Sequence, residues 1–65
     1  KLILTKREQE ILRLLSSTAT NQELAKSLYI SETTFKWHMK NILRKLGVAN
    51  RVGAVARARE LALIN

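Results

Sequence analysis

Cationic and hydroxyl side chains gather on one face of residues 32–46, together with the only tryptophan of the chain. At about 100° per residue on a helical wheel, one arc collects Thr33, Lys36, Trp37, Lys40 and Arg44. Lysine can donate hydrogen bonds to phosphate oxygens and to guanine, and indole can contact a thymine methyl group. The arc fits either a face that binds nucleic acid or a solvated charged face with the tryptophan against a neighbour.

Three further features favour nucleic acid as the partner. The net charge is +7, and seven lysines and arginines with no acidic residue lie between Glu32 and Glu60. A short segment, a tight connection at Tyr29 and Ile30, and a longer segment follow one another. This is the order of a helix-turn-helix, here about residues 21–40, whose second helix enters the major groove. The start of that second helix is rich in hydroxyl groups, which suit phosphate oxygens.

Local signals predict four helices and no strand. Thr5 with Glu8, and Thr20 with Glu23, have the spacing of capping boxes at two helix starts. Ser31 and Asn50 are expected to cap the third and fourth helices, which should run over about 32–46 and 51–64. Gly47 is the expected end of the third helix. The predicted fold class is all-α, a four-helix bundle-like domain that contains a helix-turn-helix.

Apolar periodicity predicts which side of each helix faces the core. On the first two helices the core side comprises Ile11, Leu12, Leu14, Leu15, Leu24, Ala25 and Leu28. On the third and fourth it comprises Phe35, Met39, Ile42, Leu46, Ala54, Val55, Ala58, Leu61 and Ala62. The fourth helix has a second arc that a two-fold partner would bury, formed by Val52, Ala56, Arg59 and Leu63. The alternative is that these are scattered surface residues.

Composition argues against an enzyme. The chain has 65 residues, no Cys, no Asp and one histidine, so we expect no Ser-His-Asp triad, no metal site and no cofactor. His38 is expected to be a half-buried histidine, with a phosphate contact as the alternative, and Glu8 is explained by its capping box. No apolar run suits a membrane span or a signal peptide, which favours a cytoplasmic protein. We expect residues 1–65 to form one domain, and a start without Met favours a piece of a longer protein.

Several motifs together resemble one known family. They are LTKRE at 4–8, NQELA at 21–25, ISETTFKWH at 30–38, ILRKLGV at 42–48, Asn50-Arg51 and Ala54-Val55. They resemble the LuxR-type DNA-binding domain of bacterial transcription regulators, also called FixJ-, NarL- or GerE-like. The resemblance implies a four-helix output domain that binds promoters as a dimer. Thr18, Trp37 and Gly53 depart from its usual pattern.

The resemblance assigns contacts to DNA bases to Lys36, Trp37 and Lys40. The alternatives are phosphate contact alone for the lysines and partial packing for Trp37. Contacts to the DNA backbone are expected from helix starts, hydroxyls and cations, namely Thr20, Asn21, Ser31, Thr33, Thr34, Arg44 and Lys45.

The predicted function is sequence-specific binding of double-stranded DNA by a transcription regulator. The recognition helix would be 32–46. A homodimer paired through the fourth helix would need an inverted-repeat operator with half-sites about 34 Å apart. RNA polymerase is a further candidate partner, and no membrane is expected. The alternative is a helical protein-interaction module that binds phosphates only generically.

Overall fold

The computed structural model describes residues 2–64, which form four α-helices and, within that range, no β-strand. The predicted all-α fold is therefore confirmed. Lys1 and Asn65, the ends of the predicted domain, lie outside the described residues. The helices are α1 (Lys6–Leu14), α2 (Asn21–Ser27), α3 (Glu32–Leu46) and α4 (Arg51–Glu60).

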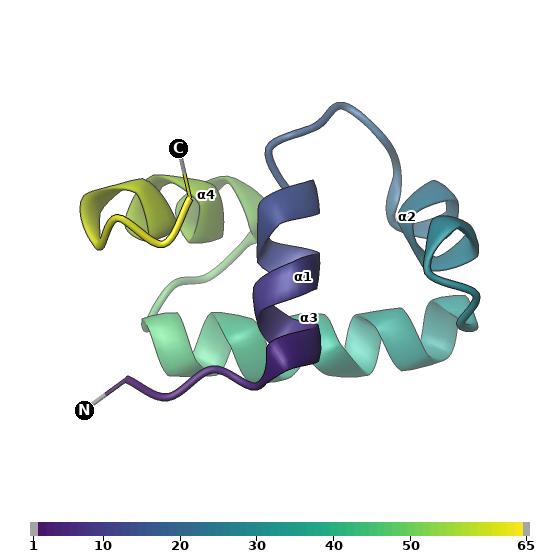
Figure 1. The fold of residues 1–65 in the computed structure, drawn as a ribbon, viewed down its shortest axis with the longest axis horizontal. Coiled ribbons are helices and arrows are strands. Elements are labelled where there is room, and N and C mark those ends of the chain that lie inside the picture. Colours follow the sequence, from purple (N-terminus) through teal and green to yellow (C-terminus); the bar gives the residue numbers. More distant parts are fainter. Residues whose placement is uncertain (1, 65) are drawn as a thin grey trace.

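The long helix α3 is the centre of the arrangement and contacts each of the other three helices. Figure 1 shows α1 standing across the middle of α3, with α2 beside the amino-terminal end of α3 and α4 on the side of its carboxyl-terminal half. The short connection 28–31 joins α2 to α3, so the predicted helix-turn-helix is present. The three neighbours cover one side of α3, and its opposite side faces outward.

Each helix begins at a side chain that satisfies a backbone N–H group of its first turn. The hydroxyls of Thr5 and Thr20 accept from the N–H groups of Glu8 and Glu23, and these two carboxylates accept from the threonine N–H groups in return. Both predicted capping boxes are thus confirmed. The predicted caps of α3 and α4 are also confirmed, by Ser31 and Asn50.

Three of the helices end with one residue in the left-handed backbone conformation. These residues are Tyr29 with φ 59°, Gly47 with φ 68° and Ala62 with φ 57°. The N–H group that follows each of them donates to the carbonyl oxygen five residues earlier, at 2.8–3.1 Å, as in a Schellman motif. Gly47 takes this conformation without a Cβ clash, whereas Tyr29 and Ala62 take it at a cost of about 1 kcal/mol each.

The predicted end of the fourth helix is wrong. α4 ends at Glu60 rather than near Ile64, because the left-handed conformation of Ala62 turns the chain back. Leu61 and Ala62, predicted to face the core, are exposed as a result. Ile64 packs against the core after this turn.

The hydrophobic core lies between α3 and the helices that cover it. Its buried apolar residues are Ile11, Leu12, Leu15, Leu24, Ala25, Phe35, Met39, Ile42, Leu46, Ala54 and Ala58. The predicted core face of α3 is confirmed at all four positions. Leu14, Leu28 and Val55 are half-buried and pack against the core. The only fully buried side chains of α4 are two alanines, so α4 is held by much less apolar surface than α3.

Polar groups in residues 2–64 are either satisfied internally or lie at the surface. No buried side-chain nitrogen or oxygen in this range lacks a hydrogen-bond partner. The same range contains no cluster of three or more residues able to hold a metal ion. None of its helices has the length and apolar character needed to cross a membrane.

Candidate nucleic-acid interface

The outward face of α3 presents the side chains that the sequence predicted there. All five are exposed, namely Thr33, Lys36, Trp37, Lys40 and Arg44. The side of α3 opposite to them is fixed in the core, which determines the direction in which they point. Trp37 is 62% exposed, which is high because large aromatic side chains are normally at least half buried. The exposure argues against the alternative in which Trp37 packs against α1 or the turn.

Trp37 has one aromatic contact, with the adjacent His38. The centroids of the two rings are 5.1 Å apart and their planes meet at 69°, an edge-to-face arrangement that is favourable for aromatic pairs. His38 is half-buried, as the sequence predicts. The contact steadies one part of the indole while most of its surface remains accessible to a partner.

The two lysines of the outward face differ in their surroundings. Lys36 Nζ lies 3.4 Å from Glu32 Oε2, and both side chains are exposed. An exposed pair of this spacing is worth only about 0.3–0.5 kcal/mol, so DNA could replace it at little cost. Lys40 has no ion pair or side-chain hydrogen bond within residues 2–64. Its ammonium group is therefore fully available for a partner.

The hydroxyl groups at the starts of α2 and α3 are mostly engaged within the fold. Ser31 Oγ donates to Thr34 Oγ1 at 2.9 Å and accepts from the Thr34 N–H at 3.0 Å. The hydrogen bond from the Thr20 N–H holds the pKa of Glu23 below its usual value, so a carboxylate stands at the start of α2. Phosphate contacts at these two positions would therefore rely on backbone N–H groups and on Thr33, which is exposed.

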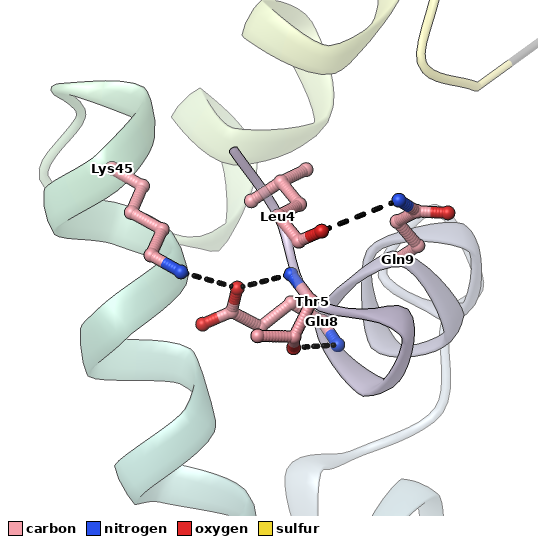
Figure 2. A network of polar contacts seen from close by, with 5 residues as sticks. All are labelled: Leu4, Thr5, Glu8, Gln9 and Lys45. Atoms are coloured by element: carbon pink, nitrogen blue, oxygen red, sulfur yellow. Dashed lines mark hydrogen bonds and ion pairs between the residues drawn. The ribbon is translucent and has the colours of Figure 1, made fainter. Parts of the chain in front are cut away.

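Lys45 points away from the outward face and pairs with Glu8 of α1. Figure 2 shows the Lys45 ammonium donating to Glu8 Oε1, at 2.7 Å, where the Thr5 N–H also donates at 2.9 Å. Burial alone would raise the pKa of Glu8, but these hydrogen bonds outweigh it and the pKa lies below its usual value. Sequence reasoning missed this pair, because nothing in the spacing of residues 37 apart indicates it. Contact of Lys45 with DNA stays a prediction that requires the pair to open.

Arg51, at the start of α4, holds the loop between α1 and α2. Its Nε donates to the carbonyl of Leu15 at 3.0 Å, Nη1 to that of Ala19 at 2.6 Å, and Nη2 to that of Ser17 at 2.8 Å. Sequence reasoning placed Arg51 in a motif without giving it a role. Its partners are backbone carbonyls, which every residue has, so the residue types do not indicate them.

The outward side of α4 retains three of the four residues predicted for a dimer face. Val52, Ala56 and Arg59 are exposed, Val52 to 79%. Leu63 is exposed but lies beyond the end of α4, so the prediction that it is on the helix is wrong, while its part in a dimer face stays a prediction. The three retained residues, hereafter the α4 face, border a hollow of about 340 Å³ whose other wall includes Leu15, Ser16 and Ser17.

Known proteins share this fold and much of this sequence. Residues 2–58 match the pattern of the bacterial regulatory proteins of the luxR family. The CsgBAC operon transcriptional regulatory protein of Escherichia coli K12 is 48% identical over 58 residues, which are 89% of this chain. The matched part is 27% of that protein, so the chain spans about a quarter of the length of this relative.

Two solved structures are similar over almost the whole chain. The response regulator ChrA of a haem-sensing two-component system has a TM-score of 0.92 and 45% identity, over 98% of this chain and 32% of ChrA. The transcription factor GerE has a TM-score of 0.86 and 35% identity, over 95% of this chain and 92% of GerE. The matched family comprises bacterial regulatory proteins. The chain therefore belongs to the luxR family of bacterial regulatory proteins and has the helix-turn-helix fold of its GerE structure.

Proposed function

We propose that this domain reads a specific DNA sequence by placing α3 in the major groove. The observation that supports this proposal is the exposure of two lysines and a tryptophan on one side of α3, while the other side is fixed in the core. A helix so anchored presents its outward face to DNA in one orientation. Base recognition needs such a fixed orientation, because hydrogen bonds to base edges are directional.

The three central side chains of α3 have two kinds of role in this proposal. Lys36 and Lys40 donate to acceptors on guanine, O6 and N7. Trp37, between them, makes apolar contact with a thymine methyl group. Glu32 accepts the Lys36 ammonium in the absence of DNA and gives it up when the groove is occupied.

Contacts to the DNA backbone position α3 without selecting a sequence. Thr33 and Arg44 are the best placed, since both are exposed on the outward face of α3. The remaining proposed contacts are Thr20, Asn21, Ser31, Thr34 and Lys45. Arg44 and Lys45 differ here, because Lys45 is already paired with a buried carboxylate.

Two copies of the domain would bind together on DNA through the α4 face. Val52 is an apolar side chain with 79% exposure, and a two-fold partner would bury it against the same surface of a second copy. Two-fold symmetry requires an inverted-repeat operator with half-sites about 34 Å apart. For the whole regulator we propose RNA polymerase as a further partner. We also propose that the regulator binds DNA and RNA polymerase in the cytoplasm.

The single tryptophan allows a direct test of which surface meets DNA. We expect Trp37 to become protected from quenching by acrylamide when a duplex binds, because base contact removes the indole from water. Fluorescence anisotropy of a labelled duplex measures binding independently in the same titration. Protection should saturate at the same protein-to-DNA ratio as anisotropy.

A charge-matched pair of variants controls this test. Lys36→Ala with Lys40→Ala removes two cations from the outward face of α3, whereas Lys6→Ala with Arg57→Ala removes two cations elsewhere. The first variant should bind far more weakly than the second. Anisotropy that reports binding while Trp37 stays as quenchable as in free protein would contradict the placement of α3 in the groove.

A further inference from the structure

The first turn of α4 is joined to the α1–α2 loop through one side chain. The Arg51 guanidinium group donates to three carbonyl oxygens of the loop, those of Leu15, Ser17 and Ala19, at 2.6–3.0 Å. Arg51 thereby contacts a loop that lies 32 to 36 positions earlier in the sequence. A planar guanidinium group has several donors in fixed directions, so it can reach three carbonyl oxygens at once. A single ammonium group cannot reproduce this arrangement.

α4 packs against α3 and α1 mainly through small side chains. Its fully buried side chains are Ala54 and Ala58, the smallest apolar side chains with a Cβ, and Val55 is half-buried. Buried apolar area determines how strongly a helix is held by packing. The three hydrogen bonds of Arg51 add to this packing a directional link between α4 and the loop.

Arg51 also lies directly beside the α4 face. The hollow between the loop and α4 is lined by Arg51 together with Val52, Ala56 and Arg59, and by Ser16 and Ser17 across from them. The loop leads at its other end into α2, which packs against α3. Besides the direct packing of α4 on α3, Arg51 thus links the surface proposed for pairing to the loop that leads into the helix-turn-helix.

We propose that Arg51 is a positioning residue that fixes the α4 face relative to the α2–α3 helix-turn-helix, so that two paired copies place their α3 helices at one spacing on DNA. The inference rests on the proposed pairing of two copies through α4. A rigid link favours one distance between half-sites, whereas a loosely held α4 tolerates several. Arg51 itself then contributes to cooperativity without touching DNA.

The test compares duplexes that hold one or two copies of the half-site selected by the wild-type chain. The two-site duplexes are inverted repeats whose centre-to-centre distance varies one base pair at a time. Arg51→Gln removes the three hydrogen bonds, Arg51→Lys keeps the charge, and Arg57→Gln removes an exposed charge from the same helix as the control. Circular dichroism identifies the variants that fold and sets a temperature at which each of these is fully folded.

For the wild type and Arg57→Gln we expect a sharp spacing preference and tighter binding to two half-sites than to one. Arg51→Gln should lose about fivefold or more of this cooperativity and bind several spacings equally, with single-site affinity close to that of Arg57→Gln. Arg51→Lys should fall between them. Because Arg51→Lys makes a smaller change, it keeps the test decisive if Arg51→Gln does not fold.

Two results would overturn the inference. Unchanged cooperativity and spacing preference in both Arg51 variants would mean that core packing alone positions α4. Equal losses on one and two half-sites would make Arg51 a DNA contact or a general stabiliser instead. If the wild type itself gains nothing from a second half-site, the proposed pairing fails, and the positioning role fails with it.

Discussion

Lys40 and Lys36 lie one turn apart on α3, yet their free energies of binding to DNA should differ. Lys36 must leave Glu32, 3.4 Å away, whereas Lys40 has no internal partner within residues 2–64. A cation without a competing partner gives its full interaction energy to the base that it contacts. Lys40 is therefore the residue at which base recognition is best measured.

Lys40→Ala should weaken binding to the cognate duplex by about 1–3 kcal/mol and relax the preference at one base position. The cause is the loss of hydrogen bonds to guanine O6 and N7. Competition binding with cognate and single-substituted duplexes measures both effects, and Lys6→Ala, an exposed lysine of α1, is the control. Equal losses on cognate and random DNA would mean that Lys40 contacts phosphate only.

At the scale of elements, the helix ends show where sequence signals suffice. All four N-caps and the end of α3 follow from residue types within a few positions. The early end of α4 does not, because Ala62 takes a conformation that alanine disfavours, while Ile64 after it packs against the core. For the same reason, the apolar pattern of 51–64 placed Leu61 and Leu63 on faces of the fourth helix, whereas both lie beyond its end.

Ala62→Gly should stabilise the domain by about 0.5–1 kcal/mol, because glycine takes the left-handed conformation without steric cost. Ala56→Gly, at an exposed position inside α4, should destabilise it by about 0.5–1 kcal/mol. Urea denaturation of both variants, at a concentration where the chain is monomeric, measures the two changes. A loss of stability in Ala62→Gly would contradict the account of how α4 ends.

The pair of Glu8 with Lys45 links α1 to α3 and gives stability a pH dependence. Because the pKa of Glu8 is lowered in the fold, its contribution is present above the pKa of the unfolded chain and is lost as the pH falls through the folded value. In Lys45→Met, burial is no longer offset by the ammonium group. The free energy difference between wild type and Lys45→Met should therefore grow as the pH rises from about 3 to about 6.

At neutral pH, Lys45→Met should destabilise the domain by about 1–3 kcal/mol, since a buried carboxylate is left with one donor fewer. Lys40→Met is the matched control, at an exposed lysine of the same helix, and should change stability little at any pH. Urea denaturation across the pH range tests both. A difference that stays constant with pH would mean that packing of the lysine side chain, not its charge, is what Glu8 requires.

For the whole molecule, the central question is how two copies meet. Val52→Glu should weaken binding to a duplex with two half-sites and leave binding to one half-site nearly unchanged, because the carboxylate would be buried against the partner. Ile3→Glu adds the same charge at another exposed aliphatic residue, 69% accessible, and should affect both duplexes equally and slightly. Equal weakening on both duplexes by Val52→Glu would rule out the α4 face as the contact.

The sequence predicted the four-helix fold and the outward face of α3 because both depend on local periodicity. The spacing of residues within one helix is enough to place Phe35 and Ile42 on one face and Lys36 and Lys40 on the other. The partners of Arg51 and Lys45 could not be predicted, because they depend on how helices far apart in the chain are packed. Base and backbone contacts stay predictions, since they depend on a partner that the chain does not contain.

Selection of duplexes from a random pool, with sequencing at two salt concentrations, tests sequence-specific reading by α3 most directly. We expect enrichment of a short inverted repeat that persists at the higher salt, because base contacts do not depend on counterion release as phosphate contacts do. The same selection with Lys40→Ala should relax one position in each half-site. Salt-sensitive retention of DNA with no enriched motif would rule out base reading by α3 and show that its outward face binds phosphates only.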